Sequence, residues 1–448
     1  MSQHAFTLTQ AQLRQIVADV LAHAKSLGAT AAEAKVSEGV GQTVTVRHDD
    51  VETIQYNRDK GIGITVYLGQ RRGNASTSDL SPQALRATTE AALSIARFTA
   101  EDPAAGLADP DRLARQTDAT GLDLCHPWTI SVDEAVETAR VCEAAAFAAD
   151  QRVNNSEGAT VWTEVSQFAY GNSHGFIGGY PTTQHSISCA VIAGEGDAMQ
   201  RDAWDTWTSD PADLDTAASV GRLAGQRTVA RLGARKIATT QAPILYEAPV
   251  AGGLASHFIS AVSGGSLYRK SSFLPDSVGQ AVFSDRVTIT DDPAIPKGLA
   301  SSPFDEEGVA TVRREVVSKG VVQGYFLGSY SARKLNLRST GNAGGNHNIV
   351  VQPTAGDLEA LLKQMGRGFL VTELMGSGVN GVTGDYSRGA AGFWVEGGAI
   401  AYPVQEVTIA GNLKDMYQRI VAVGSDVIVR GGRRTGSILI DNMTIAGD

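Results

Sequence analysis

The spacing of hydrophobic side chains changes several times along the chain, and each change predicts a change of secondary structure. Over residues 13–27 the apolar positions recur every three or four residues, which predicts a helix ended by Gly28. Over residues 42–68 the period falls to two, as in antiparallel strands separated by charged or glycine-containing turns. Ser81 and Pro82 then supply the N-cap and the first residue of a second helix. The first unit is therefore predicted to be a helix, several strands and a helix.

The same mixture of elements is predicted for the central part of the chain. Residues 101–118 are rich in Ala, Asp and Pro and lack periodicity, which predicts a linker. Ser131 and Glu134 have the spacing of a capping box and predict the start of a helix. The further elements predicted here are strands at 158–170 and 176–192 and a helix at 213–232. This pattern indicates a second unit of helices and strands.

The C-terminal part combines helices and strands with more glycine. The elements predicted there are a helix at 358–365, a hairpin around Gly397 and Gly398, a helix at 413–421, and strands around Ile428 and 438–440. Helices and antiparallel strands are interspersed without regular β-α-β alternation, so we predict an α+β fold of mixed antiparallel sheets. With 448 residues the chain is too long for one hydrophobic core. We expect two to three domains, with units at 1–105, 119–238 and 239–448, the last rich in glycine and dominated by strands.

Composition and charge argue against several classes of protein. The formal net charge of −10 argues against a non-specific nucleic-acid binder, which needs a cationic surface. The three cysteines, Cys125, Cys142 and Cys189, are odd in number and have no metal-like spacing, which favours a reducing compartment. The N-terminus lacks the pattern of a secretory signal, and no run reaches the ~18 apolar residues of a membrane span. We therefore predict a cytoplasmic protein.

Three short motifs match catalytic patterns but lack the context that those patterns require. Residues 171–175 match G-x-S-x-G, yet a strand and a turn follow instead of the helix that a nucleophile elbow needs. Residues 376–381 match G-x-G-x-x-G, yet they lead into another glycine-rich turn. Residues 331–334 match S-x-x-K without its partner motifs. We interpret the first two as turns and the third as the basic face of a helix.

The stretch 243–257 raises the question of a metal site, because it joins an apolar strand to a helix and holds one Glu and one His. Metal-dependent hydrolysis needs several converging imidazoles or carboxylates and an open position for water. His257 has no His or Cys partner at helical spacing, and Glu247 precedes the helix. His185 and Cys189 form a close pair on one strand face, but two ligands do not make a zinc site. The residues alone therefore describe a helix without a metal.

Several long segments resemble the TldD/PmbA family, and within it the PmbA branch, which is also called TldE. The segments that carry the resemblance are 63–67, 78–83, 171–175, 268–274, 329–335, 384–396 and 409–416. The resemblance extends over essentially the full length of the chain. It implies a two-subunit metalloprotease, in which the TldD subunit binds zinc through a His-Glu-x-x-x-His motif and a later Cys, and the PmbA subunit is its partner.

The resemblance also implies that this chain lacks the metal ligands. When the segments are matched, the first motif His falls on Glu247, the motif Glu on Ala248, the second His on Gly252 and the later Cys on Thr435. We therefore expect no catalytic residue, no metal ligand and no cofactor in this chain. Zinc is expected in a TldD-like partner subunit.

The family complex is expected to enclose its active site in a cavity between the subunits and to take in unfolded peptides by strand pairing, which reads backbone groups. The candidate cavity residues of this chain are polar, charged or tyrosine side chains in glycine-rich loops. They are Tyr268, Arg269, Lys270, His347, Asp385, Tyr386 and Arg388. No direct contact with nucleic acid or a membrane is expected, and self-association of the chain without its partner is left open.

The residues and the resemblance together support one leading function and two alternatives. The leading hypothesis is a non-metal-binding subunit of a cytosolic TldD/TldE-type metalloprotease that degrades or trims unfolded peptides, such as antitoxins or peptide-antibiotic precursors. The first alternative is a modulator of DNA gyrase that acts by protein–protein contact. The second is a peptidase in its own right, with a metal site assembled from His174, His185, His257 or His347. The sequence does not decide whether the chain by itself is an enzyme.

Overall fold

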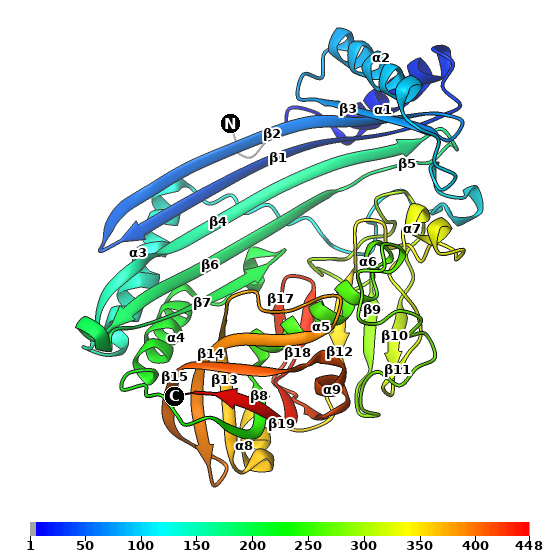
Figure 1. The fold of residues 1–448 in the computed structure, drawn as a ribbon. Helices are drawn as coiled ribbons and strands as arrows, with labels where there is room; N and C mark the ends of the chain where they lie inside the picture. The colour runs from blue at the N-terminus through cyan, green and yellow to red at the C-terminus, as the bar shows by residue number, and fades with distance from the viewer. Residues whose placement is uncertain (1–5, 448) are drawn as a thin grey trace.

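The computed structural model describes residues 6–447 of the chain. A long, twisted sheet from the first half of the chain lies across the top of the molecule in Figure 1, and the C-terminal half packs beneath it. Residues 1–5, part of the stretch on which the absence of a secretory signal is predicted, lie outside the described residues. None of the helices in the described range is long and apolar enough to cross a membrane.

Residues 10–230 build a seven-stranded antiparallel sheet with helices on one face. Its elements are α1 (Gln10–Ser26), β1 (Ala31–Arg47), β2 (Asp50–Leu68), β3 (Arg71–Thr77), α2 (Pro82–Phe98), α3 (Val132–Ala149), β4 (Val153–Asn172), β5 (Ile177–Gly178), β6 (Pro181–Ala193), β7 (Gln200–Thr208) and α4 (Ala217–Ala230). The strand order is β3-β2-β1-β4-β6-β7, with β5 paired to the end of β4. Helices α1 and α2 cover one end of the sheet, and α3 and α4 cover the other.

Side-chain alternation along β1 lets one strand serve both the core and a cavity beneath the sheet. Ala32, Ala34 and Val36 are buried in the cluster that α1 and α2 form with the sheet. Glu33 and Lys35 point to the opposite face, because successive strand side chains alternate. That face turns toward the C-terminal half of the chain, and both residues line a cavity there.

The C-terminal half contains a closed barrel and a further sheet. Its elements are β8 (Thr240–Tyr246), α5 (Ala248–Ala261), α6 (Gly264–Tyr268), β9 (Ile289–Asp292), β10 (Arg314–Ser318), β11 (Val321–Val322), α7 (Ser329–Lys334), β12 (Asn348–Val351), α8 (Leu358–Met365), β13 (Gly368–Met375), β14 (Asp385–Glu396), β15 (Ala399–Asn412), α9 (Leu413–Gln418), β16 (Ile420–Val423), β17 (Ile428–Arg430), β18 (Arg433–Thr435) and β19 (Ile438–Ala446). Strands β15, β14, β13, β8 and β19 pair in that order, and β15 also pairs with β19, so the five strands close into a barrel. The other sheet has the order β11-β10-β9-β12-β18-β17, and α5 packs against β13, β17 and β18.

The predicted α+β fold of mixed sheets is confirmed, although several element bounds differ. Strand β1 begins at Ala31, well before residue 42, and β2 is one continuous strand, because the two strands pair along their whole length. The helix predicted at 413–421 ends at Gln418, since the chain turns there into β16. The sheet joins strands from the first two predicted units, and the three-unit division stays a prediction.

Residues 101–118 form a structured connection and are fixed against α7. Asp102 accepts hydrogen bonds from the Tyr330 hydroxyl at 2.7 Å and from Nζ of Lys334 at 2.7 Å. Arg333 donates to backbone carbonyls of the same connection. The basic face of the S-x-x-K helix therefore holds this segment to the C-terminal half.

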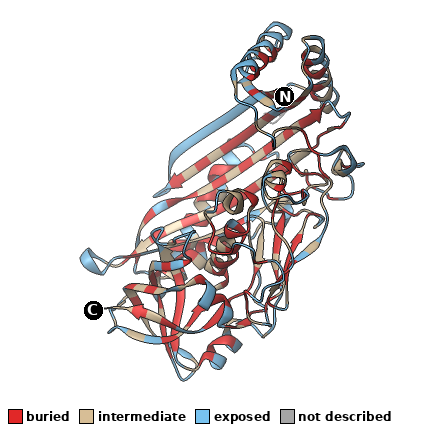
Figure 2. Ribbon diagram, turned by 45° about the vertical axis from the view of Figure 1, so that its right-hand side comes forward, coloured by how far each residue is buried: buried red, intermediate tan, exposed pale blue. Residues whose placement is uncertain are grey.

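Strand β2 has an open edge, because β3 pairs with it only over residues 62–68. Residues 50–60 are exposed throughout and form the long pale-blue strand of Figure 2. This stretch includes the apolar side chains of Val51 and Ile54, which are 43% and 48% exposed. An open edge presents unpaired backbone groups to which another chain can pair.

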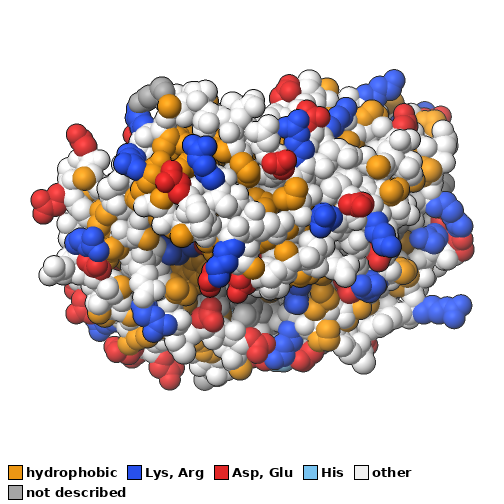
Figure 3. Space-filling model, turned by 90° about the horizontal axis from the view of Figure 1, so that it is seen from below, with side chains coloured by type: hydrophobic (Ala, Val, Ile, Leu, Met, Phe, Trp, Pro, Cys, Tyr) orange, Lys and Arg blue, Asp and Glu red, His pale blue; other side chains and the backbone are white. Residues whose placement is uncertain are grey.

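Charged side chains of both signs share the molecular surface. In Figure 3, which shows the molecule from below, Lys and Arg are interspersed with Asp and Glu. That face lacks the single-sign basic field that nucleic-acid binding requires.

Candidate functional site

The four positions that the resemblance assigns to the metal motif come together at the start of α5. Glu247 is the N-cap of this helix, directly after β8. The backbone N–H of Ala248 donates to Oγ of Ser437 at 3.0 Å, which ties the helix start to the segment after β18. Further along α5, a Cβ on Gly252 would lie 3.8 Å from Cγ2 of Thr435. The fold therefore gathers these positions although nearly two hundred residues separate Glu247 from Thr435 in sequence.

A partly buried ion pair occupies this place. Arg227, on α4, donates to both carboxylate oxygens of Glu247 at 2.8 and 3.0 Å. The side chains are only 18% and 15% exposed. Burial opposes the charge of Arg227, but the hydrogen bonds and the charge of Glu247 outweigh it and raise its pKa. The guanidinium also lies 5.1 Å from the ring centre of Trp204, a cation–π distance.

The residues at this place do not fit a zinc ion. Zinc in proteins needs three or four nitrogen, sulfur or carboxylate ligands. Glu247 is already neutralised by Arg227, Gly252 has no side chain, and the Thr435 hydroxyl donates to the Gly436 carbonyl at 3.0 Å. The side chain of Arg433 crosses the helix beside Gly252, 3.4 Å from a Cβ added there, and brings a second cation. Within residues 6–447 no group of three or more His, Cys, Asp or Glu side chains could hold a metal ion.

The four histidines proposed for a metal site within this chain alone do not lie together. His185 lies between the Thr163 hydroxyl at 2.8 Å and the His126 carbonyl at 2.9 Å, so both its ring nitrogens have partners. His174 contacts the Ala108 carbonyl at 3.1 Å. The other two candidates, His257 and His347, lie in separate cavities of the C-terminal half.

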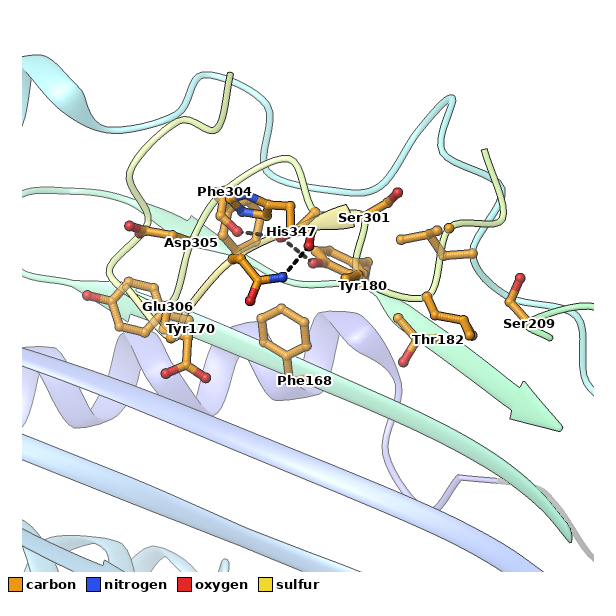
Figure 4. Close-up of a pocket in the computed structure, with 18 of the residues that line it drawn as sticks. Phe168, Tyr170, Tyr180, Thr182, Ser209, Ser301, Phe304, Asp305, Glu306 and His347 are labelled. Carbon is orange, nitrogen blue, oxygen red and sulfur yellow. Dashed lines mark hydrogen bonds between the residues drawn. The ribbon is translucent and has the colours of Figure 1, made fainter. Parts of the chain in front are cut away.

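Two adjoining cavities lie between the sheet and the glycine-rich loops of the C-terminal half. Their volumes are about 300 and 580 Å³, and Lys35, Tyr170 and Glu306 line both. Figure 4 shows the smaller one: Phe168 and Tyr170 rise from β4, and Asp305 and Glu306 come from the facing loop. The aromatic rings supply apolar walls, and the loop supplies carboxylates.

Buried carboxylates give these cavities their electrostatic character. Glu33 accepts hydrogen bonds from the hydroxyls of Tyr67 at 3.0 Å and Tyr170 at 2.8 Å. Burial raises the pKa of Glu33, although these hydrogen bonds lower it in part. Burial, with a contribution from Glu307, also raises the pKa of Asp305 to about 7, against three backbone N–H donors that lower it. The cavities can therefore bind cationic or hydrogen-bond-donating groups, with acidity that changes near neutral pH.

His347 is the one predicted cavity residue that lines the smaller cavity. Its ring Nδ1 lies 3.3 Å from Oδ2 of buried Asp291, and its backbone N–H donates to Oδ1 of the same residue at 2.8 Å. Burial raises the pKa of Asp291, but hydrogen bonds from His347 and Asn342 outweigh it and hold the pKa below its usual value. This arrangement fixes the loop that closes the cavity.

The other predicted cavity residues lie in two different places. Tyr268 ends α6 and packs edge-to-face on Tyr330, which lines the larger cavity, while Arg269 and Lys270 are exposed. On β14, Asp385 is exposed and Tyr386 is buried, and Arg388 lines a third cavity. These residues are therefore not gathered around one cavity, and their contact with substrate stays a prediction.

Sequence reasoning missed the carboxylate Glu33 and the tyrosines that hold it. The signal available was the placement of Glu33 and Lys35 between buried alanines of one strand. The buried neighbours are Ala32, Ala34 and Val36, so the alternation marks a polar face, but it does not show that Tyr170 packs against it.

Family models and relatives place the chain among known proteins. The models are PmbA/TldA metallopeptidase domain 1 at residues 32–96, the central domain at 125–232 and the C-terminal domain at 239–447. The chain is 50% identical over 427 residues to Metalloprotease PmbA of Escherichia coli O157:H7, which covers 95% of this chain and 94% of that protein. It is 23% identical to a TldD homolog of Haemophilus influenzae over 82% of this chain and 80% of that protein.

Solved structures share the whole architecture. A Bacteroides thetaiotaomicron protein, described as a candidate modulator of DNA gyrase, has a TM-score of 0.92 and 28% identity and covers 98% of this chain and 100% of its own. TldE of Thermococcus kodakarensis has a TM-score of 0.86 and 21% identity, with coverage of 96% and 100%. The family models and the fold thus define a chain of the metallopeptidase type. The chain belongs to the PmbA/TldD metallopeptidase family.

Proposed function

We propose that this chain is the non-metal-binding subunit of a cytoplasmic two-subunit metalloprotease of the TldD/TldE type. A TldD-like partner supplies the zinc and the catalytic residues. This chain supplies a wall of the enclosed cavity and surfaces that hold unfolded peptides. Antitoxin-like chains and peptide-antibiotic precursors are the proposed substrates.

The observation that carries the proposal is the bidentate ion pair between Arg227 and Glu247. It fills the place of the first motif ligand with a guanidinium, and Gly252 and Thr435 offer no replacement ligands. A cation placed against Arg227 would be repelled at short range. These contacts support the proposal that a second chain supplies the metal.

Two features support a role in holding peptides. The open edge of β2 over residues 50–61 offers backbone donors and acceptors to an extended chain. The larger cavity beneath the sheet offers the Glu33 carboxylate to basic side chains or to a peptide amino terminus, while Glu306 is paired with Lys35 at 3.1 Å. Both features can accept many sequences, as a protease of unfolded peptides requires.

Reconstitution tests the proposal. The chain and a TldD-like subunit encoded in the same genome are purified separately and mixed with an unfolded peptide. We expect cleavage only in the mixture and co-elution of the two chains in size-exclusion chromatography. Cleavage by this chain alone, abolished by a chelator, would show that it is a peptidase in its own right.

The Bacteroides thetaiotaomicron protein is described as a candidate modulator of DNA gyrase, which supports one alternative function for this chain. A modulator of DNA gyrase that acts by protein–protein contact would co-purify with gyrase from cells lacking the TldD-like subunit. The leading proposal predicts that it does not.

A further inference from the structure

A third cavity, of about 420 Å³, lies between the α5–α6 region and the loop that precedes β14. It is separate from the two cavities beneath the sheet, with which it shares no lining residue. Hydroxyl, apolar and basic side chains together form its wall. They are His257, Ser260, Ala261, Ser266, Ser271, Phe273, Ser377, Val379, Arg388 and Leu413, with Gly376 and Gly381 between them.

Arg388 enters this cavity without an acidic partner. None of the described lining residues is Asp or Glu, and no hydrogen bond or ion pair joins the Arg388 side chain to another described residue. Its Nε atom is buried and lacks an acceptor. The neighbouring Asp385 points to the other face of β14, where it accepts hydrogen bonds from Thr383 at 2.6 Å and Asn412 at 3.1 Å.

A buried donor on a guanidinium without an acceptor is unfavourable, because the group loses its hydration without a replacement. Arg227 and Arg231, by contrast, both contact carboxylates. Arg388 is therefore suited to receive an acceptor from outside the chain.

The rest of the wall favours an anion carried on an apolar group. The hydroxyls of Ser260 and Ser377 can donate hydrogen bonds to an oxyanion, while the Ser271 hydroxyl donates to the Ser266 carbonyl at 3.3 Å. His257 is half-buried and packs edge-to-face on Tyr386, with ring centres 6.0 Å apart. Burial, with a smaller contribution from the charge of Arg388, lowers the pKa of His257, so near neutral pH this ring is uncharged and can donate one N–H.

We propose that this third cavity binds a carboxylate, and specifically the carboxyl terminus of a peptide that ends in an apolar residue. Arg388 pairs with the carboxylate in the fork geometry that guanidinium and carboxylate share. The apolar side chain lies against Phe273, Val379 and Leu413. The proposal rests on the proposed handling of peptides, and it adds that free carboxyl ends are recognised by this chain and not by the partner.

The test measures binding to the chain alone, without the partner and without cleavage. The probes are fluorescein-labelled Ala-Ala-Phe with a free carboxyl end and the same peptide with a carboxyl-terminal amide, followed by fluorescence anisotropy. We expect the acid to bind at least about tenfold more tightly than the amide. This ratio of affinities corresponds to at least one hydrogen bond to a charged group that the amide lacks. Equal affinities, or no binding of the acid at 1 mM, would overturn the proposal.

Variants locate the site. Arg388→Met should remove the preference for the acid, and Arg388→Lys should keep part of it, because Lys keeps the charge but loses the fork. Arg286→Met is the matched control, since Arg286 is exposed, lies outside the cavity and carries the same charge. An unchanged preference in a folded Arg388→Met variant, or an equal loss in Arg286→Met, would show that the carboxylate binds elsewhere.

Competition distinguishes the sources of the anion. N-acetyl-phenylalanine should displace the labelled peptide more effectively than acetate, because it fills the apolar wall as well. Displacement by inorganic phosphate at lower concentration than by N-acetyl-phenylalanine would overturn the carboxylate assignment. Failure of the complex to form with a TldD-like chain would count against the proposed function but would leave these binding results unchanged.

Discussion

Replacing Arg227 with Met should strongly destabilise the chain, because it leaves the Glu247 carboxylate without its partner in a place that is largely shielded from water. With Glu247 at 15% and Arg227 at 18% exposure, the pair is largely shielded from water. Removing one partner of such a pair costs about 3–5 kcal/mol. Loss of the cation–π contact with Trp204 adds about 0.5–1 kcal/mol. The second carboxylate near Arg227, Asp202 at 3.5 Å, also loses its partner, although Arg231 remains near it at 3.8 Å. We therefore expect a loss of about 4 kcal/mol.

A double-mutant cycle separates the pair from its surroundings. Glu247→Gln keeps one acceptor for Arg227 and should cost about 2 kcal/mol, because the guanidinium loses its full counter-charge. Combined with Arg227→Met, it should cost clearly less than the sum of the two single changes, since no buried charge is then left unpaired. The assay is urea unfolding followed by tryptophan fluorescence and circular dichroism, with the four proteins measured at one pH.

Two results would refute this reasoning. An Arg227→Met variant within 0.5 kcal/mol of the wild type, on the order of a typical surface substitution, would show that Glu247 is not buried as described. Additive losses in the double variant would show that the two side chains do not interact. Either result would reopen the motif position to a metal.

Three further predictions concern other parts of the molecule. Glu33→Gln should gain stability relative to the wild type as pH rises above 4.5, the ordinary pKa of the group, because the raised pKa of Glu33 makes its ionisation less favourable in the folded state. Urea midpoints of the two proteins that shift equally with pH would contradict this. Asp102→Asn should be less stable than the wild type above about pH 4, because hydrogen bonds from Lys334 and Tyr330 lower the pKa of Asp102 to about 2. This difference in stability should disappear as pH falls from about 4 toward 2, which thermal melts across this range test. Adjacent N–H groups along β2 point to opposite sides of the strand. Ile54→Pro and Gln55→Pro should therefore differ in their effects on stability and on peptide binding. One should destabilise the sheet, and the other should keep stability but weaken peptide binding measured by anisotropy; two variants that both bind peptide normally would exclude this edge.

Local patterns made much of the fold predictable. The capping box at Ser131 begins α3, and the helix predicted at 358–365 is α8 with the same bounds. Strand β1 was predicted too short because its first residues, Ala31 to Ala34, are mostly alanine, which favours helices. Pairing with β2 and β4 overrides that preference, and local sequence does not contain this information.

The candidate sites depend on contacts between distant segments. Glu33 meets Tyr170 across 137 positions of sequence. Glu247 meets Arg227, which lies on a helix that shows no unusual pattern in sequence. The motif alignment stays a prediction, and the contact of Arg227 with Glu247, at the position that the alignment names, is visible only in the fold.

At the positions that match the family's metal motif, this chain is expected to hold no zinc of its own. The most direct test is the zinc content of the chain purified alone, determined per polypeptide by elemental mass spectrometry, with a TldD-like subunit prepared in parallel as the positive control. We expect a value near zero for this chain and about one for the control, which carries a single ligand set. About one zinc per polypeptide in this chain, retained through dialysis, would contradict it.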